Sequence, residues 1–252
     1  MLPIKKIESS VAEKMRNAAS AVHGFDHLKR TALGAVWFAK ALGLDLKEQQ
    51  IFYVAGLVHD FDRPLSEKEH KDINAAAADR FLRQFKIEDI IRRRIVGLVE
   101  QHRTFSKKPL ADQCLFLSDK LLEQSGAYII FRRCVYVGEC LDFKEEDFYE
   151  SMIFHWKERM NKFRPEKFHK NMSSLAHYQY GWQTRFFEAL ESGQEWAVSI
   201  AKECYDVGKT HRKTLLRTIE EMIPWQEGKE FKEEALLYVK GEKFGDFEKL
   251  IQ

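Results

Sequence analysis

The chain has 252 residues, of which 44% are hydrophobic and 32% are charged, so it is long enough to bury a sizeable core. The formal net charge is only +2, which argues against a partner selected by bulk electrostatics, such as duplex nucleic acid. No apolar stretch approaches the roughly 20 residues of a membrane-spanning helix, and the N-terminus lacks the apolar core of a signal peptide. We therefore expect a cytoplasmic protein without a membrane partner.

Apolar residues recur at three- and four-residue spacing through most of the chain, which is the pattern of amphipathic helices. No convincing run alternates with the period of two that a strand requires. The pattern predicts an all-α fold. The predicted helices, in chain order, span residues 9–22, 25–42, 46–59, 67–85, 88–102, 110–125, 127–138, 145–163, 170–192, 195–208, 211–223 and 230–250.

Residues that favour helix ends mark several of these boundaries. Gly43 is suited to cap the end of one helix, and Asp45 is suited to cap the start of the next. Pro109 is placed to begin the helix that carries Asp119, and Gly126 to end it. These signals agree with the helical periodicity on either side of them.

His59 and Asp60 stand side by side at the end of the apolar run Ile51–Val58. An imidazole nitrogen and a carboxylate oxygen are ligands suited to a divalent transition metal. Adjacent residues within a helix point about 100° apart, so this pair can face one ion only where the helix ends. Pro64 favours such an end, because the residue before a proline is pushed out of the helical region.

Other candidate ligands accompany the doublet. His27 lies upstream, and His70, His102 and Asp119 lie downstream, each inside or at the end of an apolar-periodic segment. His23 precedes His27 by four residues, a spacing that places two imidazoles on one face of a helix. The order of these residues is His, His-Asp, His, His, Asp.

This order resembles that of the HD-domain superfamily of metal-dependent phosphohydrolases. The resemblance covers residues 20–135 well and residues 165–196 loosely. The closing segment, with Leu117-Ser-Asp119-Lys-Leu, Gly126-Ala127 and Arg132, is similar to that of the bacterial and archaeal YedJ-like branch. The other matching motifs are His27-Leu-Lys-Arg30-Thr31, Leu57-Val-His-Asp60, His70-Lys-Asp-Ile-Asn-Ala-Ala-Ala-Ala78 and Val96-Gly-Leu-Val-Glu-Gln-His102.

The resemblance implies an HD-domain helical bundle with accessory helices over residues 1–196. A helical C-terminal extension over residues 197–252 is expected to pack on the same domain. One or two divalent metal ions per chain are expected, with Mn, Fe, Co, Ni and Mg as candidates. The implied metal ligands are His27, His59, Asp60 and Asp119, with His70 and His102 as ligands of a second metal or as phosphate contacts.

Basic residues beside a metal are candidates for binding phosphate oxygens. The catalytic candidates are Asp60, which would bridge two metals, and Asp62. Asp62 is either the general base or a cap at the helix end, and a metal-bound hydroxide would need no separate base. The substrate-binding candidates are His23, Lys29, Arg30, Arg63, Lys120 and Arg132.

The expected reaction is hydrolysis of a phosphoester or phosphoanhydride of a nucleotide or small phosphorylated metabolite by a metal-activated water. Two alternatives stay open: a di-iron oxygenase similar to inositol oxygenase, and a non-catalytic sensor that binds a metal or a nucleotide. The aromatic stretch Tyr178–Trp182 either stacks a base or forms the core face of a helix. The expected partner is the small phosphorylated substrate, and a homodimer remains an alternative to a monomer.

Overall fold

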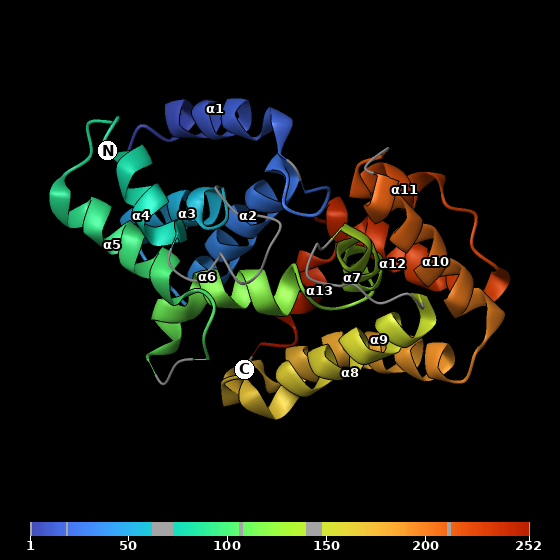
Figure 1. The fold of residues 1–252 in the computed structure, drawn as a ribbon. Helices are drawn as coiled ribbons and strands as arrows, with labels where there is room; N and C mark the ends of the chain where they lie inside the picture. The colour runs from blue at the N-terminus through green and yellow to red at the C-terminus, as the bar shows by residue number, and fades with distance from the viewer. Residues whose placement is uncertain are drawn as a thin grey trace. The chain divides into compact units, whose positions relative to one another are not determined.

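The chain is all-α in the part that the structure describes, and each of its regular elements is a helix (Figure 1). This confirms the predicted fold class. Within the same residues, no helix has the length and apolar character needed to cross a membrane. The chain forms two compact units, Met1–Glu123 and Gln124–Gln252. The described residues of this computed structural model are 2–18, 20–61, 73–105, 108–139, 148–210 and 213–251.

The first unit is a helical bundle that ends in a run of short helical turns. Helix α2 packs along α3, and both contact α6. The last turn, η3, is a π-helix, in which the hydrogen bonds close wider turns than in an α-helix. The elements are α1 (Ile4–Lys14), η1 (Met15–Asn17), α2 (Phe25–Ala41), α3 (Leu46–Val58), α4 (Ile73–Leu82), α5 (Asp89–Gln101), η2 (Leu110–Gln113), α6 (Cys114–Leu117) and η3 (Ser118–Leu122).

The close packing of α2 on α3 depends on a glycine. A Cβ atom added at Gly56 would collide with the backbone of Ala32, so the two helices meet there backbone to backbone. The loop between them has the predicted caps. Gly43 adopts a φ of 72°, and the side chain of Asp45 accepts a hydrogen bond from the Glu48 N–H (2.9 Å). This contact fixes two helices whose ends carry candidate ligands.

The second unit is also helical and contains an aromatic cluster. Phe231 lies against Trp182 and Trp196, with ring centroids 5.2 and 5.1 Å away. Helix α7 packs along α10. The elements are α7 (Tyr128–Glu139), α8 (Phe148–Lys162), η4 (Pro165–Lys167), η5 (Lys170–Met172), α9 (Ser173–Glu191), α10 (Glu195–Thr210), α11 (Leu215–Glu221), η6 (Gln226–Gly228), α12 (Lys229–Val239) and α13 (Phe244–Glu248).

Some observed boundaries differ from the predicted ones. The first helix begins at Ile4, directly after Pro3, rather than near residue 9. The predicted helix 230–250 is divided into α12 and α13, because Gly241 adopts a φ of 78° that a continuing helix does not allow. The division between the compact units falls after Glu123, whereas the sequence suggested a core domain that extends to residue 196.

Candidate metal centre

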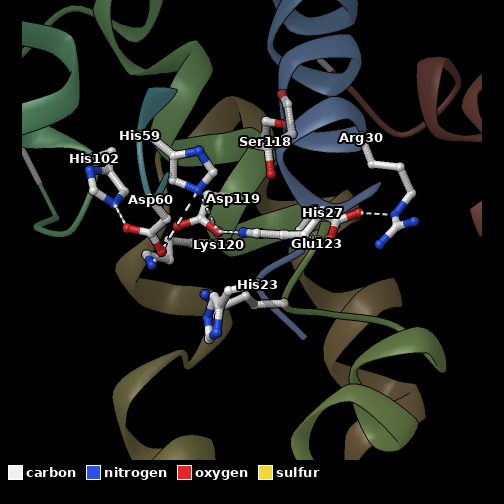
Figure 2. Close-up of polar contacts among 12 residues, drawn as sticks. His23, His27, Arg30, His59, Asp60, His102, Ser118, Asp119, Lys120 and Glu123 are labelled. Carbon is white, nitrogen blue, oxygen red and sulfur yellow. Dashed lines mark hydrogen bonds and ion pairs between the residues drawn. The ribbon is translucent and has the colours of Figure 1, made fainter. Parts of the chain in front are cut away.

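The first unit gathers five of the predicted metal ligands in one buried cluster (Figure 2). The ligands come from four different helical elements and the loop after one of them. His27 lies in the first turn of α2, Asp119 lies in η3, and His59 and His102 are the C-terminal caps of α3 and α5. Asp60 follows His59 outside the helix, so the pair lies at a helix end as the sequence predicted. The cluster is thus assembled mainly from helix ends.

In all three imidazoles, the Nδ1 atom is engaged by an acceptor that carries no proton. The Nδ1 of His59 contacts the Gly56 carbonyl oxygen (2.8 Å), and that of His102 contacts the Val99 carbonyl oxygen. The Nδ1 of His27 contacts Glu123 Oε2 (2.8 Å). Each Nδ1 must therefore donate a proton, which leaves Nε2 of a neutral ring as the coordinating atom.

The Nε2 atoms face the two aspartates at separations that exceed a hydrogen bond. Asp119 Oδ1 lies 3.8 Å from the Nε2 of His27 and 3.9 Å from that of His59. The carboxylate oxygens of Asp60 lie 3.9 Å from the Nε2 of His59 and 3.5 Å from that of His102. Ligands that each stand about 2.0–2.2 Å from one ion are separated by roughly 3–4 Å from one another. The spacing therefore matches ligands that share an ion.

Two overlapping groups of these residues satisfy the geometry of a metal site. Their ligand atoms all lie within 4.8 Å of one another in each group, and His59 belongs to both. One group adds His27 and Asp60 to His59, and the other adds His102 and Asp119. The arrangement is compatible with one ion or with two adjacent ions.

The hydrogen-bonding state of two Nε2 atoms is a second reason why the cluster fits a metal. The Nε2 atoms of His59 and His102 are buried and have no hydrogen-bond partner among the described residues. A buried acceptor without a partner costs about 1–3 kcal/mol. A divalent cation removes this cost, because it uses the lone pair that no proton donor occupies.

Burial and neighbouring charge keep His59 neutral and Asp119 anionic, which are the protonation states that bind a metal. Burial lowers the pKa of His59 to about 3, against the opposing charges of Asp60 and Asp119, so this ring is neutral at pH 7. Burial alone would raise the pKa of Asp119. The charge of Lys120 outweighs that effect and holds the pKa of Asp119 well below its ordinary value. Asp119 is therefore an anionic ligand at neutral pH.

Two further polar residues contact Asp60, and one of them, Asn74, was not assigned a role from the sequence. The Asn74 amide in α4 donates to the His59 carbonyl oxygen (2.8 Å) and to Asp60 Oδ1 (2.6 Å). A guanidinium nitrogen of Arg103 lies 3.5 Å from the same Asp60 oxygen. The signal for Asn74 was a lone amide followed by four alanines, whereas Arg103, directly after His102, was among the basic residues considered for binding phosphate. Both residues help to hold Asp60.

The fully buried carboxylate of Glu123 was also not assigned from the sequence. Besides His27, it accepts a hydrogen bond from Arg30 Nε (2.7 Å). Burial would raise its pKa, but the charge of Arg30 and the hydrogen bond from His27 bring it down to about 2. The available sequence signal was an acidic residue four positions after Asp119, directly after two leucines.

The predicted substrate-binding residues of the first unit lie in different places. Lys120 Nζ stands 2.5 Å from Asp119 Oδ2, and Arg30 reaches the cluster through Glu123. Lys29 instead contacts Glu8 (2.5 Å) and Tyr53, and so ties α2 to α1 and α3. Lys29 follows His27 by two positions, so its side chain leaves α2 in a direction about 200° away from that of His27.

His23 lies beside His27 but not on the same helix. The two ring centroids are 5.6 Å apart, and His23 Nδ1 lies 2.9 Å from Ser20 Oγ. The expectation that both imidazoles share a helical face is wrong, because Gly24 in an extended conformation precedes the first residue of α2. The loop before the helix nevertheless brings the two rings together.

Of the remaining predicted site residues, one lies in the second unit and three lie outside the described residues. Arg132 lies on α7 in the second unit, where its side chain is buried and its Nε and Nη2 atoms have no hydrogen-bond partner among the described residues. Asp62, Arg63 and His70 lie outside the described residues.

Comparison with known protein families identifies one matching segment. The family model described as HD domain matches residues 24–123, which span all the clustered histidines and aspartates. The match ends at the last residue of the first compact unit. Neither the curated proteins nor the solved structures gave a match. The match does not distinguish branches of the family, so the YedJ-like assignment stays a prediction.

Proposed function

Because residues 24–123 belong to the HD domain superfamily, we propose that this protein is a metal-dependent phosphohydrolase. The proposed reaction cleaves a phosphoester or phosphoanhydride bond in a nucleotide or a small phosphorylated metabolite. The observation that carries the proposal is the convergence of three Nε2 atoms and two carboxylates in one buried cluster. Such a donor set suits Mn, Fe, Co or Ni, with Mg as a further candidate.

The residues proposed to hold the metal are His27, His59, Asp60 and Asp119. A bound divalent cation supplies Lewis-acid polarisation of a phosphoryl oxygen and lowers the pKa of its bound water. The two aspartates contribute negative charge, and the neutral histidines contribute lone pairs. Asn74 keeps Asp60 in position through the 2.6 Å hydrogen bond to Oδ1. Burial excludes bulk water from the ligands and strengthens their electrostatic effect.

His102 would have one role in a one-metal site and another in a two-metal site. Its Nε2 lies 3.5 Å from Asp60 Oδ1, so Asp60 can serve as a bridge between His102 and the other ligands. With a second ion, His102 and the predicted ligand His70 would coordinate it. With one ion, His102 would contact the phosphate of the substrate. We propose two available positions and a mononuclear resting form.

Positive charge beside the cluster is proposed to bind the substrate phosphate. Lys120 is placed at Asp119, and Arg103 is placed at Asp60, with 27% of its side chain exposed. Both cations can compensate charge on phosphoryl oxygens, the lysine as a point charge and the arginine through a planar fork. The general base proposed from the sequence is Asp62, and Arg132 stays a substrate contact predicted from the sequence alone.

Metal analysis combined with a substrate screen tests the proposal. We expect at least one transition metal per purified chain and Mn-stimulated release of phosphate or pyrophosphate, including under anaerobic conditions. Asp60→Ala and Asp119→Ala should each lose the metal and at least about 10³-fold in activity, because positioning of the ion and activation of water fail together. Asp79→Ala is the control, since Asp79 pairs with Arg92 and Arg83 instead.

The outcomes separate the candidate functions. Oxygen consumption with an organic substrate, without phosphate release from a broad panel, would favour the di-iron oxygenase. Metal and nucleotide binding without turnover would favour a sensor. In the same assays, His102→Ala should halve the metal content of a two-metal protein or raise only the Michaelis constant of a one-metal protein. Full metal occupancy of both aspartate variants would overturn the site.

A further inference from the structure

The three clustered imidazoles differ in the group that accepts the hydrogen bond from their Nδ1 nitrogen. His59 and His102 each donate from Nδ1 to the backbone carbonyl three residues earlier in the same helix. His27 donates instead to a carboxylate 96 residues away in the sequence, that of Glu123. The orientation of His27 therefore depends on tertiary structure, whereas the other two rings are held by their own helix ends.

The π-helical turn η3 is what brings this carboxylate to His27. The Glu123 N–H donates to the Ser118 carbonyl oxygen (2.9 Å), a wide turn that closes over five residues. Asp119 and Glu123 then lie about one turn apart and face the two nitrogens of one ring. Figure 2 shows His27 between them, with Asp119 toward Nε2 and Glu123 toward Nδ1.

The same turn is fastened to α2 at two further points. Ser118 Oγ donates to the carbonyl oxygen of Thr31 (2.7 Å), one helical turn after His27. Arg30 Nε donates to Glu123 Oε1 (2.7 Å), so both carboxylate oxygens of Glu123 are engaged by α2. A carboxylate held at both oxygens cannot rotate away from the histidine.

We propose that Glu123 is the positioning residue for the metal ligand His27. Its carboxylate fixes the Nδ1–H tautomer, aims Nε2 at Asp119 and increases the basicity of that nitrogen as a ligand. Arg30 holds the carboxylate and acts on the metal site through it. This inference rests on the proposed metal site and assigns to Arg30 a role different from direct phosphate binding.

The test measures tautomer and metal affinity rather than turnover. In the metal-free protein, nitrogen NMR shifts of the histidine side chains should report a proton on Nδ1 of His27. Glu123→Leu removes the acceptor, so it should give a mixture of both tautomers and weaken the binding of Co or Mn about 100-fold. Glu123→Gln keeps an acceptor oxygen without the charge, so it should keep the tautomer and weaken binding only about 10-fold.

A matched control and a fold check accompany these variants. Glu48→Gln removes one carboxylate partner of Arg94 in the same unit and should leave the tautomer and the affinity unchanged. Circular dichroism establishes whether Glu123→Leu folds. If it does not fold, the isosteric Glu123→Gln decides through metal affinity alone.

Failure of this inference is distinguishable from failure of the proposed function. Wild-type affinity in both Glu123 variants, with an unchanged His27 tautomer, would overturn the positioning role and leave the metal site standing. Absence of metal binding in every form, the wild type included, would overturn the proposed function and the positioning role with it.

Discussion

The two compact units differ in the kind of side-chain cluster that each one buries. The first unit buries ionisable groups together, among them His59, Asp119 and Glu123. The second unit packs aromatic rings around Phe231. Burial of apolar area stabilises a fold directly, whereas burial of charge costs free energy unless a partner or a ligand compensates. Because the second unit also buries charged side chains, Arg132 and Arg159 among them, the contrast lies in the clustering of histidines with carboxylates, and we propose that the metal chemistry belongs to the first unit.

The largest expected effect concerns acid stability of the metal-free protein. The pKa of His59 is about 3 in the folded state and 6.5 ordinarily, so the unfolded chain takes up this proton first as the pH falls. Stability should be complete above pH 6.5 and decline toward pH 3, by a total on the order of 5 kcal/mol. Denaturant titration after removal of metal by a chelator measures this decline.

The acid effect should be traceable to the first unit. His59→Gln should flatten the decline between pH 6.5 and 3, whereas His177→Gln, at an exposed position of α9 in the second unit, should leave it unchanged. If the free energy of unfolding declines equally with falling pH in the wild type and in both variants, the buried imidazole does not govern acid unfolding.

The second prediction addresses the aromatic core. Phe231 is only 2% exposed, so Phe231→Ala should reduce the free energy of unfolding by about 3–5 kcal/mol through lost burial and a residual cavity. Metal affinity should not change. Phe154→Ala is the control, because Phe154 is 53% exposed on α8. Thermal unfolding and metal titration of the two variants check the prediction; weaker metal binding in Phe231→Ala would contradict the division of roles.

The prediction with the smallest expected effect concerns two pairs of helices that each pack closely at a glycine. Gly56 lies against the backbone of Ala32, and Gly138 lies against the backbone of Tyr205. An added methyl group at either site should force the helices apart and cost about 1–3 kcal/mol. Only Gly56→Ala should also weaken metal binding, because α2 and α3 carry His27 and His59. Equal metal affinity in the two variants would show that the ligands tolerate this displacement.

Local signals in the sequence were sufficient to locate much of the cluster. The helical period, the cap residues Gly43 and Asp45 and the effect of Pro64 placed the His59–Asp60 pair at a helix end, as observed. The family resemblance supplied His27, which has no strong local signal of its own. Helix ends are set by neighbouring residues, and such features are therefore readable without a structure.

Partners from distant helices were not predictable in this way. Glu123 meets His27 across 96 residues, and Asn74 meets Asp60 across 14, so neither contact leaves a periodic trace in the sequence. The break after Glu123 was missed for a related reason. An amphipathic helix shows that one face is buried, but its pattern does not identify the unit that buries it.

The π-helical turn has a consequence for how relatives of this chain should be aligned. A π turn holds one residue more than an α-helical turn over the same stretch of helix. An α-helical turn without that residue would keep the following residues in nearly the same orientation and would bring the acidic position one residue closer to Asp119 in the sequence. In a relative without the extra residue, the acid equivalent to Glu123 is thus expected three positions after the aspartate. An alignment without a gap in Ser118–Leu122 would pair it with Leu122 and overlook the correspondence.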